Sequence, residues 1–407
     1  QTVGDLAGYR PLDANARDTA LSVRDGEFGV RQPIARDRYT VKGNVVTLTG
    51  GFEKGRTYEL TYRPAEWPVA GLGLAAYRDF TSWLRYSPQS LAPVDHTVGF
   101  GSSQSGRFLR TFFYYGFNAD EQGRKVLDGA MVHIAGAARL SLNDRGAQPT
   151  SLTMYAATQF PFATTAERDP ITKRTDGLLE NGRALKTQPK VMFTNTAVEY
   201  WGGGRAAALI HTTPDGKRDL ALPPHVRAYF LTGAQHGPAP FPAPPEKAGQ
   251  QPANPLEYWW TMRALLVAMI DWVTKGSEPP PSQVPRLADG TLVPPLPQSG
   301  MGFPNIPGVT YNGLMTTRYR FNYGPRFEQG IMDLNPPTVT APYQNNPLNG
   351  PIYNNMIPKT DADGNDIAGV RLPELAVPLN TYTGWALRAD PNKNDGCESS
   401  GQRIPFA

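Results

Sequence analysis

The chain has 407 residues, of which 40% are hydrophobic and 19% charged, enough apolar sequence for a large globular core. Its 40 basic and 36 acidic residues give a net charge of +4, with the two signs interspersed. We therefore expect no nucleic-acid partner, because such a partner is usually contacted by a concentrated basic surface. The one arginine-rich stretch, Arg318–Tyr323, alternates with period two and predicts a half-exposed strand.

The single cysteine, Cys397, excludes an internal disulfide, and no Cys/His cluster has metal-ligand spacing. We therefore expect neither a metal nor another cofactor. The longest apolar helix, which ends at Lys275, carries too many charges for a membrane span. A start at Gln1 rather than Met is typical of a processed chain or of a fragment, and it favours a periplasmic or secreted protein over a cytoplasmic one.

The first 50 residues are expected to be irregular apart from a hairpin around Tyr39–Thr49. The alternating run Thr57–Arg63 is rich in β-formers and predicts a strand. Leu72–Arg85 follows helical periodicity. The apolar residues that share one face of this helix are Leu72, Ala76, Phe80, Trp83 and Leu84.

Short apolar runs bounded by turn residues follow, and we expect strands at Thr97–Gly101, Ala130–Ala135, Val191–Thr196 and Val226–Thr232. Helical segments separate them, including Ser105–Tyr115, which Gly116 ends. This alternation is typical of parallel βαβ units. The sequence therefore predicts an α/β fold, with a mostly parallel twisted sheet and helices on both of its faces.

The last helix of the predicted core has Asn254 as its expected N-cap and Pro255 at its first position, and it ends at Lys275 before Gly276. The composition then changes, since the final 132 residues hold 20 of the 40 prolines. This segment is neither highly charged nor poor in aromatic residues, so we expect it to be ordered.

Three segments result from these boundaries. Residues 1–50 are the irregular N-terminal segment, 51–276 the catalytic core, and 277–407 a loop-rich extension that wraps the core. Two roles for the extension stay open: a lid over the site, or an assembly surface through which copies of the chain form a homo-oligomer.

Residues 101–106 read G-S-S-Q-S-G and lie between a predicted strand and a predicted helix. This pattern is typical of a nucleophile elbow, a sharp and strained turn in which small neighbours let the backbone approach itself closely. Ser103 has small residues two positions before and after it, so it is the best nucleophile candidate. The sequence departs from the usual G-x-S-x-G pattern at one position, because Ser105 replaces the second glycine. A plain tight turn is the alternative.

An activated serine needs a base, and the base needs an acid that orients it. His236 is the favoured base, because it lies in the turn directly after the strand Val226–Thr232. His211 is the alternative base. The remaining histidines lie within or before a strand and fit less well: His96, His133 and His225.

Glu199 is the first carboxylate after the strand Val191–Thr196 and is the predicted acid. Asp215 and Asp219 compete with it but lie farther from the strand end, and Asp215-Gly216 is typical of a turn. Tyr200 and Trp201 follow Glu199 directly in the chain, and they could line a substrate pocket or belong to the core.

The backbone N–H of Gln104 is the expected oxyanion donor. A second donor normally comes from an earlier strand-to-helix loop, for which Arg63–Gly71 is the candidate. Asp361–Asn365 resembles the start of a calcium loop but lacks the bidentate glutamate, so we predict a hairpin turn there. Gly71-Leu72-Gly73 lacks the third glycine and the acidic partner of a dinucleotide site.

These motifs together resemble a bacterial branch of the α/β-hydrolase superfamily, over residues 45 to 405. The strings that carry the resemblance are residues 69–79, 101–110, 116–118, 128–129, 199–201, 235–236 and 369–388 with Cys397. The resemblance implies a serine hydrolase with Ser103, Glu199 and His236 as its triad. Gly202–Gly204 departs from the family pattern beside the acid, which could alter the pocket.

We expect an enzyme that cleaves a small-molecule carboxylic ester through an acyl-enzyme intermediate. Esters are favoured over amides because the alcohol is an easier leaving group and because esterases are frequent on this fold, which is an argument from analogy. An amidase or lactonase with the same triad is one alternative. A non-catalytic binding protein on a hydrolase scaffold is the other.

Overall fold

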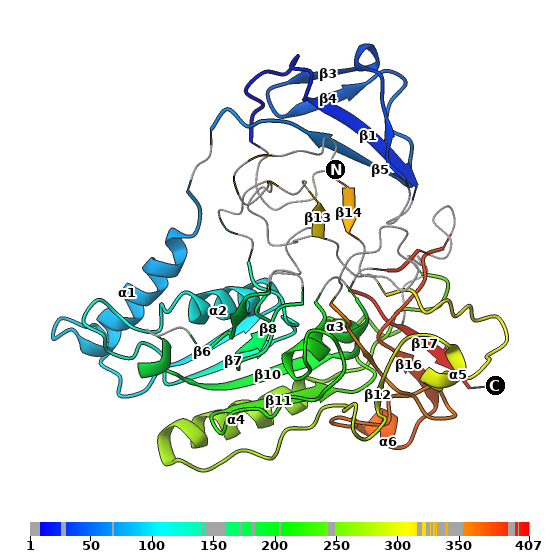
Figure 1. The fold of residues 1–407 in the computed structure, drawn as a ribbon. Helices are drawn as coiled ribbons and strands as arrows, with labels where there is room; N and C mark the ends of the chain where they lie inside the picture. Colours follow the sequence, from blue (N-terminus) through cyan, green and yellow to red (C-terminus); the bar gives the residue numbers. More distant parts are fainter. Residues whose placement is uncertain are drawn as a thin grey trace.

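The structure is a computed structural model that describes residues 9–25, 30–66, 69–140, 142, 160–170, 173–180, 184–202, 205–242, 249–315, 320–322, 326, 329, 331, 338–340, 353–389, 395–397 and 399–406. Four parallel strands form the central sheet: β6 (Val98–Ser102), β7 (Gly129–His133), β10 (Lys190–Thr196) and β11 (Val226–Leu231). Their order in space follows their order in the chain (Figure 1). The expected parallel α/β sheet is confirmed.

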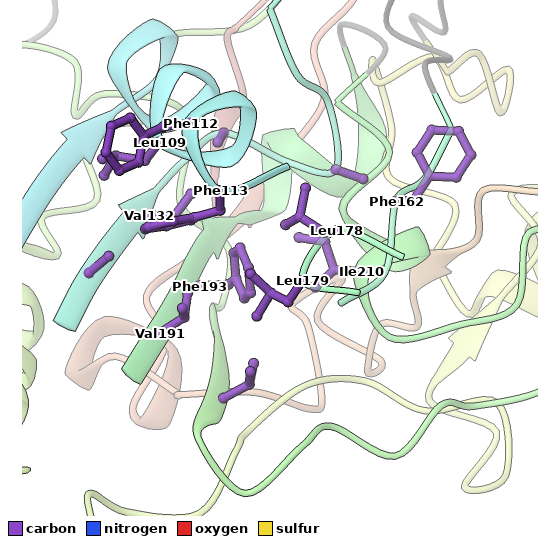
Figure 2. Packing of buried hydrophobic residues seen from close by; sticks show 14 of the residues in the cluster. Leu109, Phe112, Phe113, Val132, Phe162, Leu178, Leu179, Val191, Phe193 and Ile210 are labelled. Atoms are coloured by element: carbon purple, nitrogen blue, oxygen red, sulfur yellow. The ribbon is translucent and has the colours of Figure 1, made fainter. Parts of the chain in front are cut away.

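Helices cover both faces of this sheet, because the strand side chains alternate between two apolar clusters. Ala130 and Val132 face α2 (Gln104–Tyr114), whose aromatic residues pack over the strands in Figure 2. Met131, between them, faces α4 (Trp259–Lys275) on the opposite side. Figure 1 shows the same layers, with α2 and α4 on opposite sides of the strands.

The predicted helix after residue 71 is present as α1 (Leu72–Tyr86), but its apolar stripe is not the face that packs on the core. Leu74 is buried, and Tyr77 packs against the α2 side of the sheet. Leu72 and Phe80 are instead 77% and 59% exposed. The first half of the helix is thus anchored by Leu74 and Tyr77, two residues outside the predicted stripe.

The N-terminal part contains more strand than the sequence indicated. The predicted hairpin is confirmed as β3 (Tyr39–Lys42) paired with β4 (Val45–Leu48). However, β1 (Ala20–Asp25) pairs with both β2 (Gln32–Pro33) and β5 (Arg56–Thr61) in an antiparallel sheet, although residues 20–25 were expected to be irregular. The residues of β5 that pair with β1 lie 31 to 41 positions away in the chain, so no local pattern reveals the pairing. The segment boundaries at residues 50 and 276 stay predictions.

The predicted start of the last core helix was wrong. Helix α4 begins at Trp259 rather than after Asn254, whereas its end before Gly276 is confirmed. Asn254 is fully buried, and its side-chain amide donates to the carbonyls of Gly233 and Thr383 instead of capping α4. Tertiary partners for the polar side chain therefore outweigh the local capping preference.

Short elements complete the chain. Those before α4 are η1 (Arg36–Arg38), β8 (Glu167–Arg168), β9 (Thr175–Asp176), η2 (Ala184–Lys186), α3 (Ala197–Trp201) and η3 (Ala207–Ile210). Those after it are β12 (Leu292–Val293), α5 (Gln298–Met301), β13 (Arg320–Asn322), β14 (Thr338–Thr340), β15 (Ile357–Pro358), α6 (Pro373–Ala376), β16 (Asn380–Thr383) and β17 (Gln402–Pro405). The strand predicted at 318–323 is present at 320–322, and its remaining residues lie outside the described ranges.

The extension packs against the core at several points. Val370 forms a parallel bridge with Leu231 of the central sheet. Trp201 of the core shares an apolar cluster with Trp385 and Phe303 of the extension. Within the described ranges, no helix is long and apolar enough to cross a membrane.

Candidate active site

Ser103 lies between β6 and α2, in a backbone conformation that non-glycine residues rarely adopt. Its φ is 55° and its ψ is −112°. The register of the sheet places Ser102 beside His133, and the Ser103 N–H donates to the His133 carbonyl at 2.9 Å. The strained serine is thus held at the carboxyl end of the sheet, with its hydroxyl beyond the strands.

The small residues around Ser103 are required by close backbone contacts. A Cβ at Gly101 would overlap the carbonyl of Ser105, and one at Gly106 would lie 2.9 Å from the carbonyl of His133. At the position where the motif departs from glycine, the Ser105 hydroxyl accepts from the Ser102 N–H at 2.9 Å and donates to the Ser102 carbonyl at 2.8 Å. The departure therefore adds two bonds across the turn.

His236 connects Ser103 to Glu199. Its Nε2 lies 2.8 Å from Ser103 Oγ, and its Nδ1 lies 2.7 Å from Glu199 Oε1. These distances are within hydrogen-bond range. The three residues follow β6, β10 and β11, so their convergence results from the parallel alignment of the strand ends. The structure brings together the serine, base and acid that the sequence selected.

Glu199 is fully buried at the third position of α3, where it forms a capping box with Thr196. Both the N–H and the hydroxyl of Thr196 donate to Glu199 Oε2. Arg205, itself 4% exposed, places Nη1 3.8 Å from Oε1. Burial alone would raise the pKa of Glu199, but His236, Arg205 and Thr196 outweigh it and hold the pKa below its usual value. Glu199 is therefore a carboxylate at neutral pH.

Thr196 and Arg205 were not selected from the sequence. A signal existed for the first, because Thr196-Ala197-Val198-Glu199 is a capping-box pattern. No local sequence pattern indicates Arg205, because only the folded backbone brings it close to Glu199.

The alternative bases do not contact Ser103 through their side chains. His211 Nε2 lies 2.9 Å from the Tyr200 hydroxyl, in the core. His133 is fully buried, with Nδ1 2.9 Å from Thr194 Oγ1, and burial lowers its pKa to about 4. His96 faces Asp128 at 3.7 Å. The partly buried ring of His225 lies before β11, at the far end of the sheet from the site.

The competing acids have other partners. Asp215 accepts from the Thr213 hydroxyl and the Lys217 N–H in the predicted turn. Asp219 accepts from the backbone of Leu287 and Ala288. Neither contacts a histidine of the site.

Tyr200 and Trp201 are 2% and 3% exposed. Tyr200 packs on Phe230, and Trp201 packs on Trp385. These contacts favour the core role over the pocket role, two alternatives that the sequence left open. Of Gly202–Gly204, where the sequence departs from the family pattern, the structure describes only Gly202, and residues 203 and 204 lie outside the described ranges.

Gln104 is the first residue of α2, so its N–H lies at the positive end of the helix dipole. A donor from Arg63–Gly71 stays a prediction, and residues 67 and 68 lie outside the described ranges. Across the residues that the structure describes, no group of three or more His, Cys, Asp or Glu side chains could hold a metal ion. The predicted hairpin turn at Asp361–Asn365 is confirmed, since Asp361 N–H donates to the Asn365 carbonyl.

A family profile described as an alpha/beta hydrolase domain matches residues 30–407. The matched range contains Ser103, Glu199 and His236. No curated protein and no solved structure matches the chain.

Proposed function

This chain belongs to the α/β-hydrolase domain family, and on that premise we propose that it is a serine esterase of small carboxylic esters. The observation that carries the proposal is the unbroken hydrogen-bond path from Ser103 through His236 to the buried Glu199. A path of this kind is what activates a serine hydroxyl for attack on a carbonyl carbon.

In the first half of the reaction, Ser103 Oγ attacks the ester carbonyl while His236 Nε2 takes the hydroxyl proton. The Gln104 N–H stabilises the negative charge that develops on the carbonyl oxygen. His236 then donates the proton to the leaving alcohol as the ester C–O bond breaks, which leaves an acyl group on Ser103.

In the second half, His236 removes a proton from water, and the resulting hydroxide attacks the acyl carbonyl. The bond to Ser103 Oγ breaks, the proton returns to Ser103, and the carboxylic acid leaves. Glu199 stays ionised throughout and stabilises the imidazolium that forms twice in the cycle. Its lowered pKa supports this role.

An amidase or a lactonase would use the same residues, so the triad alone does not separate them from an esterase. The ester is preferred because an alcohol is a better leaving group than an amine. A non-catalytic binding protein is disfavoured by the intact triad and by the strained φ of Ser103, since backbone strain of about 1 to 3 kcal/mol is typically retained at functional sites.

The test is hydrolysis of p-nitrophenyl esters of increasing acyl length, with p-nitroanilides as the amide counterpart. Ser103→Ala is expected to lower kcat by more than about 10³-fold. Ser102→Ala, the neighbouring serine, is the matched control and should keep most of the activity. A fluorophosphonate should label Ser103 alone in the folded protein.

Full ester hydrolysis by Ser103→Ala would remove the proposal. Absence of labelling in the folded wild-type protein would favour the binding protein. Faster turnover of anilides than of esters would favour the amidase.

A further inference from the structure

The turn that carries His236 is held by residues from the far end of the chain. Residues 232 to 237 follow β11, and the first of them is tied to the extension, because both the N–H and the hydroxyl of Thr232 donate to the Val370 carbonyl. The next residue, Gly233, has φ 66°, and a Cβ there would lie 2.8 Å from Leu375. The first two residues of the turn, Thr232 and Gly233, are thus both in contact with the extension, which directs the backbone toward His236.

Both backbone polar groups of Gly233 are bound by buried side chains. Its N–H donates to Asp366 Oδ2 at 2.7 Å, and its carbonyl accepts from the Asn254 amide. Asp366 is 4% exposed and Asn254 is fully buried. Asn254 also donates to the Thr383 carbonyl, so it links the turn to β16. The two peptide groups that flank the Gly233 Cα are therefore both held in place.

Gln235, directly before His236, is held in the same way. Its Oε1 accepts from the N–H of Gly401 at 3.0 Å and from that of Asn254 at 3.3 Å, and its Nε2 donates to the Gly237 carbonyl at 2.7 Å. A Cβ at Gly401 would overlap the Thr383 carbonyl, which explains why the extension approaches with bare backbone. The extension thus contacts the turn on both sides of Ala234, through Asp366 at Gly233 and through Gly401 at Gln235.

Asp366 is the unexpected member of this group, because a carboxylate is costly to bury. No cation within ion-pair distance of it occurs among the described residues. Arg371 favours its ionised form and Asp361 opposes it, and the charge of Asp366 in turn raises the pKa of the buried Tyr200. Burial raises the pKa of Asp366 to about 7. An apolar residue of similar size would avoid this cost but would leave the Gly233 N–H without its acceptor.

We propose that Asp366 is a positioning residue for His236, through which the extension sets the distance from the imidazole to Ser103. This inference rests on the proposed function. Its physical basis is that Gly233 lies three residues before His236, and that an error of about 1 Å in a catalytic group can cost on the order of 100-fold in rate. The extension then acts as a scaffold of the catalytic turn rather than as a separate lid.

The experiment compares Asp366→Ala with Asp366→Asn in the full chain, on a p-nitrophenyl ester and with a fluorophosphonate. Asp366→Ala removes the acceptor and is expected to lower kcat at least tenfold with KM within about twofold, because substrate contacts are unchanged. The rate of Ser103 labelling should fall in parallel, since it also needs His236 as base. Asp366→Asn keeps an acceptor oxygen and should retain at least half of kcat.

Asp215→Ala is the matched control, because Asp215 also accepts a backbone N–H in a turn but has no contact with the turn of His236. It should keep wild-type kcat and labelling rate. A folded Asp366→Ala with wild-type kcat and labelling rate would overturn the inference, as would a loss of kcat that Asp366→Asn shares in full.

If Asp366→Ala does not fold, Gln235→Leu against Gln235→Glu makes the same comparison at the second contact of the extension. Only the glutamate keeps an acceptor for Gly401. A folded Gln235→Leu with wild-type kcat would overturn the inference, because the contact with Gly401 would then have no effect on the position of His236. Failure of the proposed function is recognised separately, because Ser103→Ala would then hydrolyse the ester as fast as the wild type.

Discussion

Arg205 lies beside Glu199 in the protein interior, with Nη1 3.8 Å from Oε1 and with both side chains almost fully buried. The guanidinium also donates to the Ser399 hydroxyl through Nη2 at 2.7 Å. A buried carboxylate without a positive charge nearby would tend to take up a proton. Arg205 therefore helps to keep Glu199 ionised.

Arg205→Met is expected to raise the pKa of Glu199, because the favourable charge is lost while burial remains. The midpoint of the acid limb of kcat/KM should move to higher pH, because Glu199 then takes up a proton more readily. At neutral pH we expect a loss of about tenfold, a fraction of the 10²–10⁴-fold that a well-positioned base contributes. Arg218→Met removes an exposed arginine and serves as the control. An acid limb that does not move would contradict the role of Arg205.

Two glycine-to-alanine substitutions are expected to have opposite effects on stability, because one glycine lacks space for a Cβ and the other does not. Gly101→Ala should destabilise the protein by at least about 2 kcal/mol and abolish activity, because the new Cβ overlaps the Ser105 carbonyl in the elbow. Gly73→Ala should stabilise it by up to about 1 kcal/mol, since Gly73 lies within α1 with open space where its Cβ would be. Urea unfolding measures both. A tolerated Gly101→Ala would show that the elbow is not as tight as described.

Asp366 should make the protein less stable at alkaline pH. Its pKa is about 7 in the folded protein against an ordinary value of 3.8, so the folded state holds the proton more tightly than the unfolded state. Its contribution to stability is fully present below pH 3.8 and is lost as the pH rises through 7. The difference between the two values corresponds to roughly 4 kcal/mol at most.

Asp366→Asn removes this titration. Its stability relative to the wild type should therefore increase from pH 4 to pH 8, by several degrees in Tm. Thermal unfolding of both proteins across this range provides the measurement, with Asp215→Asn as the control. A constant difference in Tm would mean that Asp366 is already ionised in the folded protein at acidic pH.

The sequence was sufficient to select the three residues of the proposed triad because each of them follows a short apolar strand, and parallel strands align their ends. Ser103, Glu199 and His236 could be selected without knowing any long-range contact. The same local logic failed where polar groups find distant partners. Asn254 has the features of a helix cap, yet it binds the turn of His236.

Residues that act through long-range contacts gave no signal. Asp366 lies 133 positions from Gly233 in the chain, so neither periodicity nor spacing connects them. The stripe of α1 was recognised as apolar, but which face packs depends on the neighbouring helix, not on the α1 sequence. Leu72 was thus placed correctly on the helix and is nevertheless exposed.

His133 should limit stability at acidic pH. Its ring is fully buried against Tyr258 and Phe100, Nδ1 meets Thr194 Oγ1, and Nε2 has no hydrogen-bond partner within the described part of the chain. Burial lowers the pKa of His133 to about 4, against 6.5 for an ordinary histidine, although the charge of Glu199 opposes this shift. Because the unfolded state takes up the proton first, this stability is present above pH 6.5 and is lost as the pH falls toward 4.

His133→Met removes this proton uptake while keeping an apolar side chain of similar size. Whatever the substitution costs at pH 8, the variant should gain about 2 kcal/mol relative to the wild type at pH 5, since 1.5 pH units below 6.5 correspond to that energy. His211 has a lowered pKa for the same reason but is present in both proteins, so its effect cancels. Urea unfolding at the two pH values measures the difference. An equal difference at pH 5 and pH 8 would show that His133 can take up a proton in the folded protein, and that the space around Nε2 admits a partner for it.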